Sequence, residues 1–116
     1  MAAATRSPAT RLKHILFHIE GISASLYGVA FERFVDSYQL QRTVERGIEI
    51  ISEAVKSLPH SMLSRHLEIE WQKIIGIGNI LRHEYQHVDP AIMWDLATRK
   101  LPELEPAIRK LLEEIE

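Results

Sequence analysis

Apolar residues recur at intervals of three and four along most of this chain, the spacing that places side chains on one face of a helix. The pattern is clearest in one segment, where the apolar positions are Leu40, Val44, Ile48, Ile51, Val55 and Leu58. Charged residues occupy the opposite side of this segment, and Pro59 follows it. The pattern therefore predicts an amphipathic helix with one buried face that ends before the proline.

The rest of the chain follows the same pattern. Ser7 and Pro8 have the composition of a helix start, with a capping side chain followed by a proline at the first helical position, and Leu12 to Ile22 then keep helical spacing. The segments that follow are a short helix at 29–36, a turn at 62–67, a helix from 70 to about 87, and a final helix that opens at Asp89–Pro90.

Two prolines, Pro102 and Pro106, are expected to break or kink the final helix. No segment alternates apolar and polar residues as a half-buried strand would. The sequence predicts an all-α fold, a four- to five-helix bundle in a single domain spanning residues 1–116, with residues 1–7 disordered.

Composition narrows the function classes. The chain has 116 residues and no cysteine, which excludes a disulfide framework, a thiolate metal site and a cysteine nucleophile, and favours the cytoplasm. Its beginning lacks an apolar stretch of signal-peptide length, and no apolar run is long enough for a membrane span. A net charge of -2 argues against nucleic-acid binding by bulk charge, so any RNA site needs a local positive field.

The candidate chemistry is concentrated in the segment from Gly76 to Asp89. On a helical wheel, Asn79, Arg82 and His83 share one sector about 100° wide beside the predicted buried face. A histidine near neutral pKa can take a proton from a 2′-hydroxyl or give one to a leaving oxygen. An arginine can bind the phosphate through two N–H groups, and the asparagine can orient the imidazole or add a donor. This combination suits RNA chemistry that uses no metal ion, and no cofactor is expected.

Two other interpretations stay open. The histidine at the helix edge can be an ordinary surface or interface residue, and we expect His14, His18, His60 and His66 to be surface or packing residues. The string His83-Glu84-Tyr85-Gln86-His87 also fits H-E-x-x-H, in which two histidines one turn apart bind zinc and the glutamate activates water. That remote zinc-peptidase alternative needs a third ligand near the end of the chain, such as Glu103 or Glu105.

The string GIGNILRHEYQHVDPAIMWDLATRKLPEL resembles the signature region of the HepT-like proteins of the HEPN superfamily of helical ribonucleases. The strings RLKHILFHIEGI, VERGIEIISEAVKSLP and EIEWQKIIGIGN are similar to the earlier helices of that family. The resemblance implies a HEPN-like bundle that forms a homodimer, with the motif helices of two subunits lining a cleft where RNA is cut without metal. It also implies a toxin of a prokaryotic toxin–antitoxin pair, neutralised by an MNT-type nucleotidyltransferase that attaches AMP to a tyrosine.

Carried over by position, the resemblance makes His83 the catalytic imidazole, Tyr85 the modifiable phenol and Asn79 the polar residue that follows the family's arginine. The family motif has its arginine five residues before the histidine, where this chain has Gly78. Arg82 lies one turn later on the same side of the helix, and we expect its guanidinium to extend back over the space that the glycine leaves empty. The alternative is a catalytically weakened member that acts as a binding module with a nucleotidyltransferase partner.

Overall fold

The computed structural model describes residues 7–84 and 88–115, and within these ranges every regular element is helical. The elements are α1 (Pro8–Leu26), α2 (Phe31–Val35), α3 (Tyr38–Lys56), α4 (His60–Leu63), α5 (Trp71–His83), α6 (Pro90–Asp95), the π-helical turn η3 (Leu96–Lys100) and α7 (Leu101–Ile115). The all-α prediction is confirmed. None of the described helices is both long and apolar enough to cross a bilayer.

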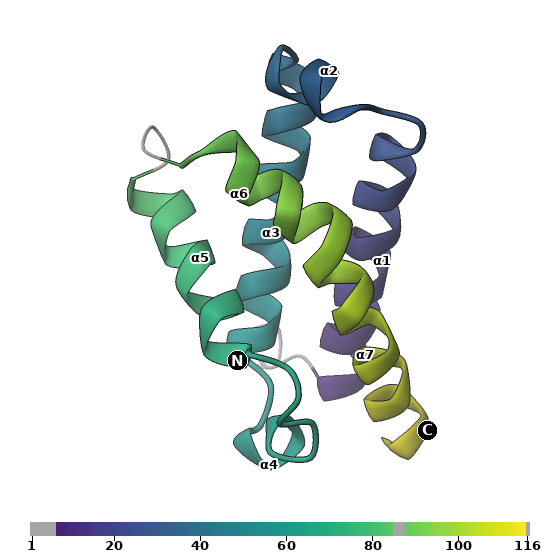
Figure 1. Ribbon diagram of the computed structural model, residues 1–116. Helices are drawn as coiled ribbons and strands as arrows, with labels where there is room; N and C mark the ends of the chain where they lie inside the picture. Colours follow the sequence, from purple (N-terminus) through teal and green to yellow (C-terminus); the bar gives the residue numbers. More distant parts are fainter. Residues whose placement is uncertain (1–6, 85–87, 116) are drawn as a thin grey trace.

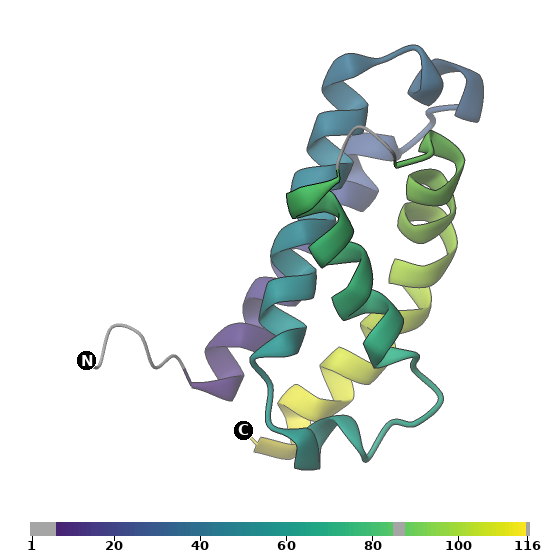
Figure 2. The same cartoon turned by 90° about the vertical axis from the view of Figure 1, so that its left-hand side faces the viewer.

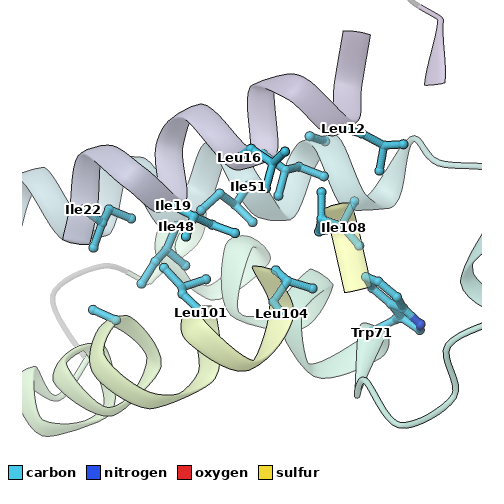
Figure 3. Close-up of a cluster of buried hydrophobic side chains, with 14 of the residues drawn as sticks. Leu12, Leu16, Ile19, Ile22, Ile48, Ile51, Trp71, Leu101, Leu104 and Ile108 are labelled. Atoms are coloured by element: carbon cyan, nitrogen blue, oxygen red, sulfur yellow. The ribbon is translucent and has the colours of Figure 1, made fainter. Parts of the chain in front are cut away.

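Long helical rods form the bundle, and α6, η3 and α7 together make one of them (Figure 1). Helix α3 packs on both α1 and α5, and α1 also packs on α7 (Figure 2). The amphipathic faces predicted from the sequence meet in one core (Figure 3). Its most deeply buried aliphatic side chains include Leu12, Ile15, Ile51, Leu104 and Ile108. Burial of each such side chain contributes about 1.5–3 kcal/mol, so the bundle is held mainly by this core.

Helix starts agree with the capping signals. The Ser7 Oγ accepts from the Thr10 N–H at 3.2 Å, and Pro8 is the first residue of α1. The Asp89 carboxylate accepts from the Ala91 N–H at 2.8 Å at the start of α6. Both predicted starts are confirmed. The predicted disorder of residues 1–7 concerns mostly residues 1–6, which lie outside the described residues.

Two features differ from the sequence prediction. The segment predicted as a turn at 62–67 begins within α4, a single helical turn. The predicted break at Pro102 takes the form of η3, where the Leu101 N–H donates to the Leu96 carbonyl five residues back. A wider turn suits a proline that cannot donate to the helix. At Pro106 the helix continues, because α7 runs through that residue.

Candidate functional site

The last turn of α5 carries Asn79, Arg82 and His83, the residues predicted to do the chemistry. The helix ends at His83, because Glu84 has a φ of −139° and has left the helical conformation. The prediction that this helix continues to about His87 is therefore wrong by four residues. Tyr85 and His87 lie outside the described residues.

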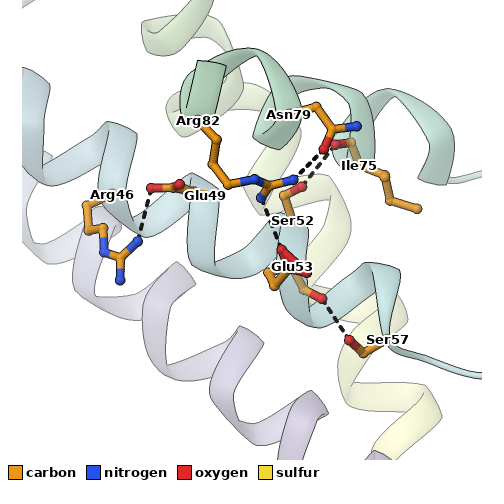
Figure 4. Close-up of polar contacts among 8 residues, drawn as sticks. All are labelled: Arg46, Glu49, Ser52, Glu53, Ser57, Ile75, Asn79 and Arg82. Carbon is orange, nitrogen blue, oxygen red and sulfur yellow. Dashed lines mark hydrogen bonds and ion pairs between the residues drawn. The ribbon is translucent and has the colours of Figure 1, made fainter. Parts of the chain in front are cut away.

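Arg82 is held in place from two sides (Figure 4). Its Nη1 donates to the Glu53 carboxylate of α3 at 3.1 Å, and its Nη2 donates to the Asn79 side-chain oxygen. Asn79 thus bonds the arginine in this structure, although the sequence also allowed it to orient the imidazole. A guanidinium has five N–H groups, so donors remain for a phosphate. The Arg82 side chain is 26% exposed, which leaves it accessible to an anion.

Gly78 lies at a close contact between α5 and α3. A Cβ atom at this position would overlap the Oγ and Cβ atoms of Ser52, whose hydroxyl donates to the Ile75 carbonyl at 3.1 Å (Figure 4). Our expectation that the glycine leaves an empty space is therefore wrong, because Ser52 fills it. The Arg82 guanidinium does extend back toward Gly78, with Nη1 3.8 Å from the ideal Cβ position.

This backbone cannot hold an arginine at residue 78. Ser52 is 2% exposed, and its overlap with any side chain at Gly78 could be relieved only by moving α3 away from α5. Within this packing, the positive charge nearest to the glycine belongs to Arg82. The close packing of Ser52 on Gly78, which the sequence alone did not reveal, is compatible with the charge of Arg82 one turn later but not with an arginine at residue 78.

A shallow hollow of about 350 Å³ adjoins Arg82 and is lined by residues of three helices. Arg11 and His14 come from α1, and Arg46, Glu49 and Glu53 come from α3. His14 is exposed, as a surface residue should be, but nothing in its spacing connects it to a helix almost seventy residues away. The fold places it along the same hollow as Arg82. His83 is exposed and is not among the residues that line this hollow.

The zinc-peptidase alternative requires His83 and His87 on consecutive turns of one helix. The helix stops at His83 and Glu84 is no longer helical, so the described residues do not continue the helix that this motif needs. Among the residues that the structure describes, no group of three or more histidine or acidic side chains could hold a metal ion. His87 itself lies outside those residues.

Comparison with known proteins gives consistent matches over most of the chain. A family model described as "Ribonuclease HepT-like" matches residues 15–111. The protein named "Putative RNase TTE0752" from Caldanaerobacter subterraneus is 36% identical over 108 residues, which cover 93% of this chain and 96% of that protein. The "Probable ribonuclease HepT" of Thermococcus cleftensis is 32% identical, over 91% of this chain and 96% of its own length.

A longer relative shares the same unit. The protein named "Gamma-glutamylcyclotransferase and putative RNase MJ0434" from Methanocaldococcus jannaschii is 34% identical over 90% of this chain, which covers 47% of that protein. No solved structure matches the chain.

Proposed function

The chain belongs to the ribonuclease HepT-like family, and from this membership we propose that it cleaves RNA without a metal ion, with His83 and Arg82 as its catalytic residues. The observation that carries the assignment of Arg82 is its position. Arg82 directly precedes His83 in the chain, and hydrogen bonds to Glu53 and Asn79 hold its guanidinium beside Gly78. An arginine held in advance loses little further freedom when it binds a phosphate.

The proposed chemistry uses the 2′-hydroxyl of the RNA as the nucleophile. The His83 imidazole takes the 2′-hydroxyl proton, and the 2′-oxygen bonds to the adjacent phosphorus. The bond from phosphorus to the 5′-oxygen breaks, and that oxygen takes up a proton, which leaves a 2′,3′-cyclic phosphate and a 5′-hydroxyl. Arg82 offsets the negative charge that develops on the phosphoryl oxygens. Asn79 acts as a positioning residue through its bond to Arg82.

Cleavage by purified protein tests this proposal. We expect the wild type to cut a single-stranded RNA oligonucleotide in the presence of a chelator, His83→Ala to lose about 10²–10⁴-fold in rate, and Arg82→Ala about 10²–10³-fold. Arg99→Ala is the matched control, because Arg99 is an exposed helical arginine paired with Asp95 at 2.7 Å and lies outside the hollow beside Arg82. Wild-type rates in Arg82→Ala would refute the role of that arginine.

The biological role proposed here is that of a cytoplasmic toxin of a prokaryotic toxin–antitoxin pair that acts as a homodimer. A single subunit offers only one imidazole and one arginine at the end of a helix, which are few groups for an active site. A two-fold dimer would bring the imidazole and the arginine of both subunits together. Expression without a partner should then arrest growth and degrade RNA, and His83→Ala should do neither. A wild type that leaves both growth and RNA intact would contradict the toxin role.

The proposed partner is an MNT-type nucleotidyltransferase antitoxin that attaches AMP to Tyr85, two residues after His83. The intact mass of the chain after co-expression with a nucleotidyltransferase encoded next to it should rise by the mass of one adenylyl group (AMP less one water), and Tyr85→Phe should abolish that rise. If cells that co-express the nucleotidyltransferase grow normally but contain only unmodified chain, this form of regulation is refuted.

A second candidate function is a binding module that has lost cleavage. The packing of Ser52 against Gly78 favours it, because the position of the family's arginine is closed to any side chain in this backbone. This candidate predicts that the wild type binds RNA or a nucleotidyltransferase but leaves RNA intact at every protein concentration tested. Cleavage that disappears in His83→Ala would exclude it.

A further inference from the structure

A second hollow continues the one beside Arg82 along the groove between α1 and α3. The two hollows share Arg46 and Ile50 in their linings. The second is also lined by Phe17, His18 and Arg42. The distance along α3 from Arg42 to Glu53 is about 16 Å at 1.5 Å per residue. Together the two hollows form one groove, the α1–α3 groove, that leads along the bundle to Arg82.

The α1–α3 groove presents arginine to solvent. Its second hollow contains Arg42 and Arg46 and, among the described lining residues, no acidic side chain. Each arginine has a glutamate partner on α3, but the arginines are the outer members: Arg46 is 69% exposed against 21% for Glu49. For Arg42 and Glu45 the values are 44% and 14%. In a chain whose net charge is -2, this groove is a local positive surface.

The second hollow is also lined by an exposed aromatic ring, that of Phe17. Phe17 is 69% exposed, and it meets the His18 ring edge-on, with the ring planes at 90° and the centroids 5.2 Å apart. Gly21 lies one turn along, and a Cβ there would have nothing within 4 Å, so the groove is open beside the ring. A large exposed aromatic next to solvent-exposed arginines is the combination that proteins use for single-stranded nucleic acid, because bases stack on the ring while cations bind the backbone.

We propose that the α1–α3 groove binds the single-stranded RNA segment that flanks the cleaved bond, with phosphates on Arg42 and Arg46 and a base stacked on Phe17. This inference rests on the ribonuclease activity proposed above. At the 3.4 Å rise of a stacked strand, the length of the groove corresponds to about five nucleotides. The strand would run from Phe17 past Arg46 to Arg82, where the reaction takes place.

A second copy of the chain fits this groove less well than RNA does. A two-fold interface uses the same patch of both copies, so the arginine-rich surface around Arg42 and Arg46 would face the arginine-rich surface of the other copy. The carboxylates that could offset them, Glu45 and Glu49, are the covered members of their pairs. A polyanion meets no such repulsion.

Electrostatics around His18 agree with a positive groove. The pKa of His18 is lowered, first by burial and then by the neighbouring charges of His14 and Arg46. Both neighbours line the groove, so the field that acts on His18 also acts on a strand bound there.

Binding measured apart from cleavage tests the proposal. In a His83→Ala background, the probe is a fluorescein-labelled single-stranded RNA of twelve nucleotides, followed by anisotropy. We expect Phe17→Ala to weaken binding about five- to hundredfold, and Phe17→Trp to keep it. Tyr27→Ala is the control, because Tyr27 is a 90% exposed aromatic at the end of the same helix and outside the groove. A fully paired RNA should bind equally well to Phe17→Ala and its parent, because its bases are already stacked.

The salt dependence isolates the arginines. Arg46→Ala should lower the slope of log affinity against log salt by about 0.7, the value for one phosphate contact on a single strand. Arg99→Ala, with the same degree of exposure, should leave the slope unchanged. Unchanged affinity in both Phe17→Ala and Arg46→Ala would overturn the groove while leaving the cleavage proposal standing.

Two further results separate the proposals. A lower molar mass of Phe17→Ala in sedimentation would show that the surface joins two subunits, and would also overturn the groove. RNA that binds through Phe17 and Arg46 but is never cut by the wild type would support the groove and refute the ribonuclease.

Discussion

Gly78→Ala provides the sharpest test of the packing that shapes the site. Without Ser52, alanine would stabilise α5 by about 1 kcal/mol, since glycine costs about that much within a helix. The added Cβ overlaps the Ser52 side chain, and overpacking of this kind costs about 1–3 kcal/mol. Displacement of Ser52 also endangers its hydrogen bond to the Ile75 carbonyl, worth about 1 kcal/mol. The net expectation is a loss of about 1–3 kcal/mol in the free energy of unfolding.

Urea unfolding at a fixed protein concentration measures this loss, and Gly76→Ala is the matched control. Gly76 lies in the same helix, but a Cβ there has nothing within 4 Å, so that variant should be more stable than wild type by about 0.5–1 kcal/mol. The melting temperature should fall for Gly78→Ala and rise for Gly76→Ala, by roughly 4 °C per kcal/mol for a domain of this size. Equal stabilisation by both substitutions would refute the close approach of α3 and α5.

A double-mutant cycle locates the cause. Ser52→Gly removes both atoms that a Cβ at residue 78 would overlap. Combined with Gly78→Ala, it exchanges the glycine between the two helices. The double variant should lose at least about 1 kcal/mol less free energy of unfolding than the sum of the losses of the single variants. The reason is that Gly78→Ala alone contains the clash with Ser52, which the double variant lacks. Additive losses would place the strain at a contact other than Ser52.

Two further predictions concern charge. Glu53→Gln should raise RNA affinity about two- to fivefold, because it removes a carboxylate that competes with RNA for Arg82, in an ion pair worth at most about 1 kcal/mol. Glu114→Gln, which alters an ion pair with Arg65 outside the groove, should leave RNA affinity unchanged. Equal effects of the two substitutions would refute the competition. The lowered pKa of His18 means that the unfolded chain takes up this proton more readily, so stability should fall as the pH drops below the usual histidine value of 6.5 and through the lower folded value. His18→Gln should flatten the stability curve between about pH 7 and 5, and an unchanged slope would contradict the assignment.

The fold could be predicted because its signals are local. Periodic apolar positions and the capping side chains of Ser7 and Asp89 act within a few residues, and the structure uses them as expected. The end of α5 was missed because residues 84–87 contain neither glycine nor proline, so no local signal stops the helix. The helix nevertheless ends at His83, and the next helix, α6, begins at Pro90.

In the candidate site too, the contacts within one helix could be predicted from the sequence and the contacts between helices could not. Helical spacing correctly placed Asn79 and Arg82 within reach of each other, three residues apart on one helix. The Glu53 partner of Arg82 lies 29 residues away in the sequence, and His14 lies farther still, so only the packing of α1, α3 and α5 brings them to one hollow. Phe17 gave no signal in the sequence, because most phenylalanines are buried and only the fold shows that this ring is exposed.

Gly78 and the Arg82 ion pair are parts of one arrangement. The glycine allows α5 to lie against Ser52, and Glu53, the next residue of α3, thereby comes within hydrogen-bond distance of the guanidinium. A larger residue at 78 would separate the helices and move Glu53 away from Arg82. If Arg82 serves the role of the family's arginine, the glycine is a requirement of that role and not a sign of decay. Gly78→Ala should then lower the cleavage rate even under conditions where the protein remains fully folded, and Gly76→Ala should leave the rate unchanged.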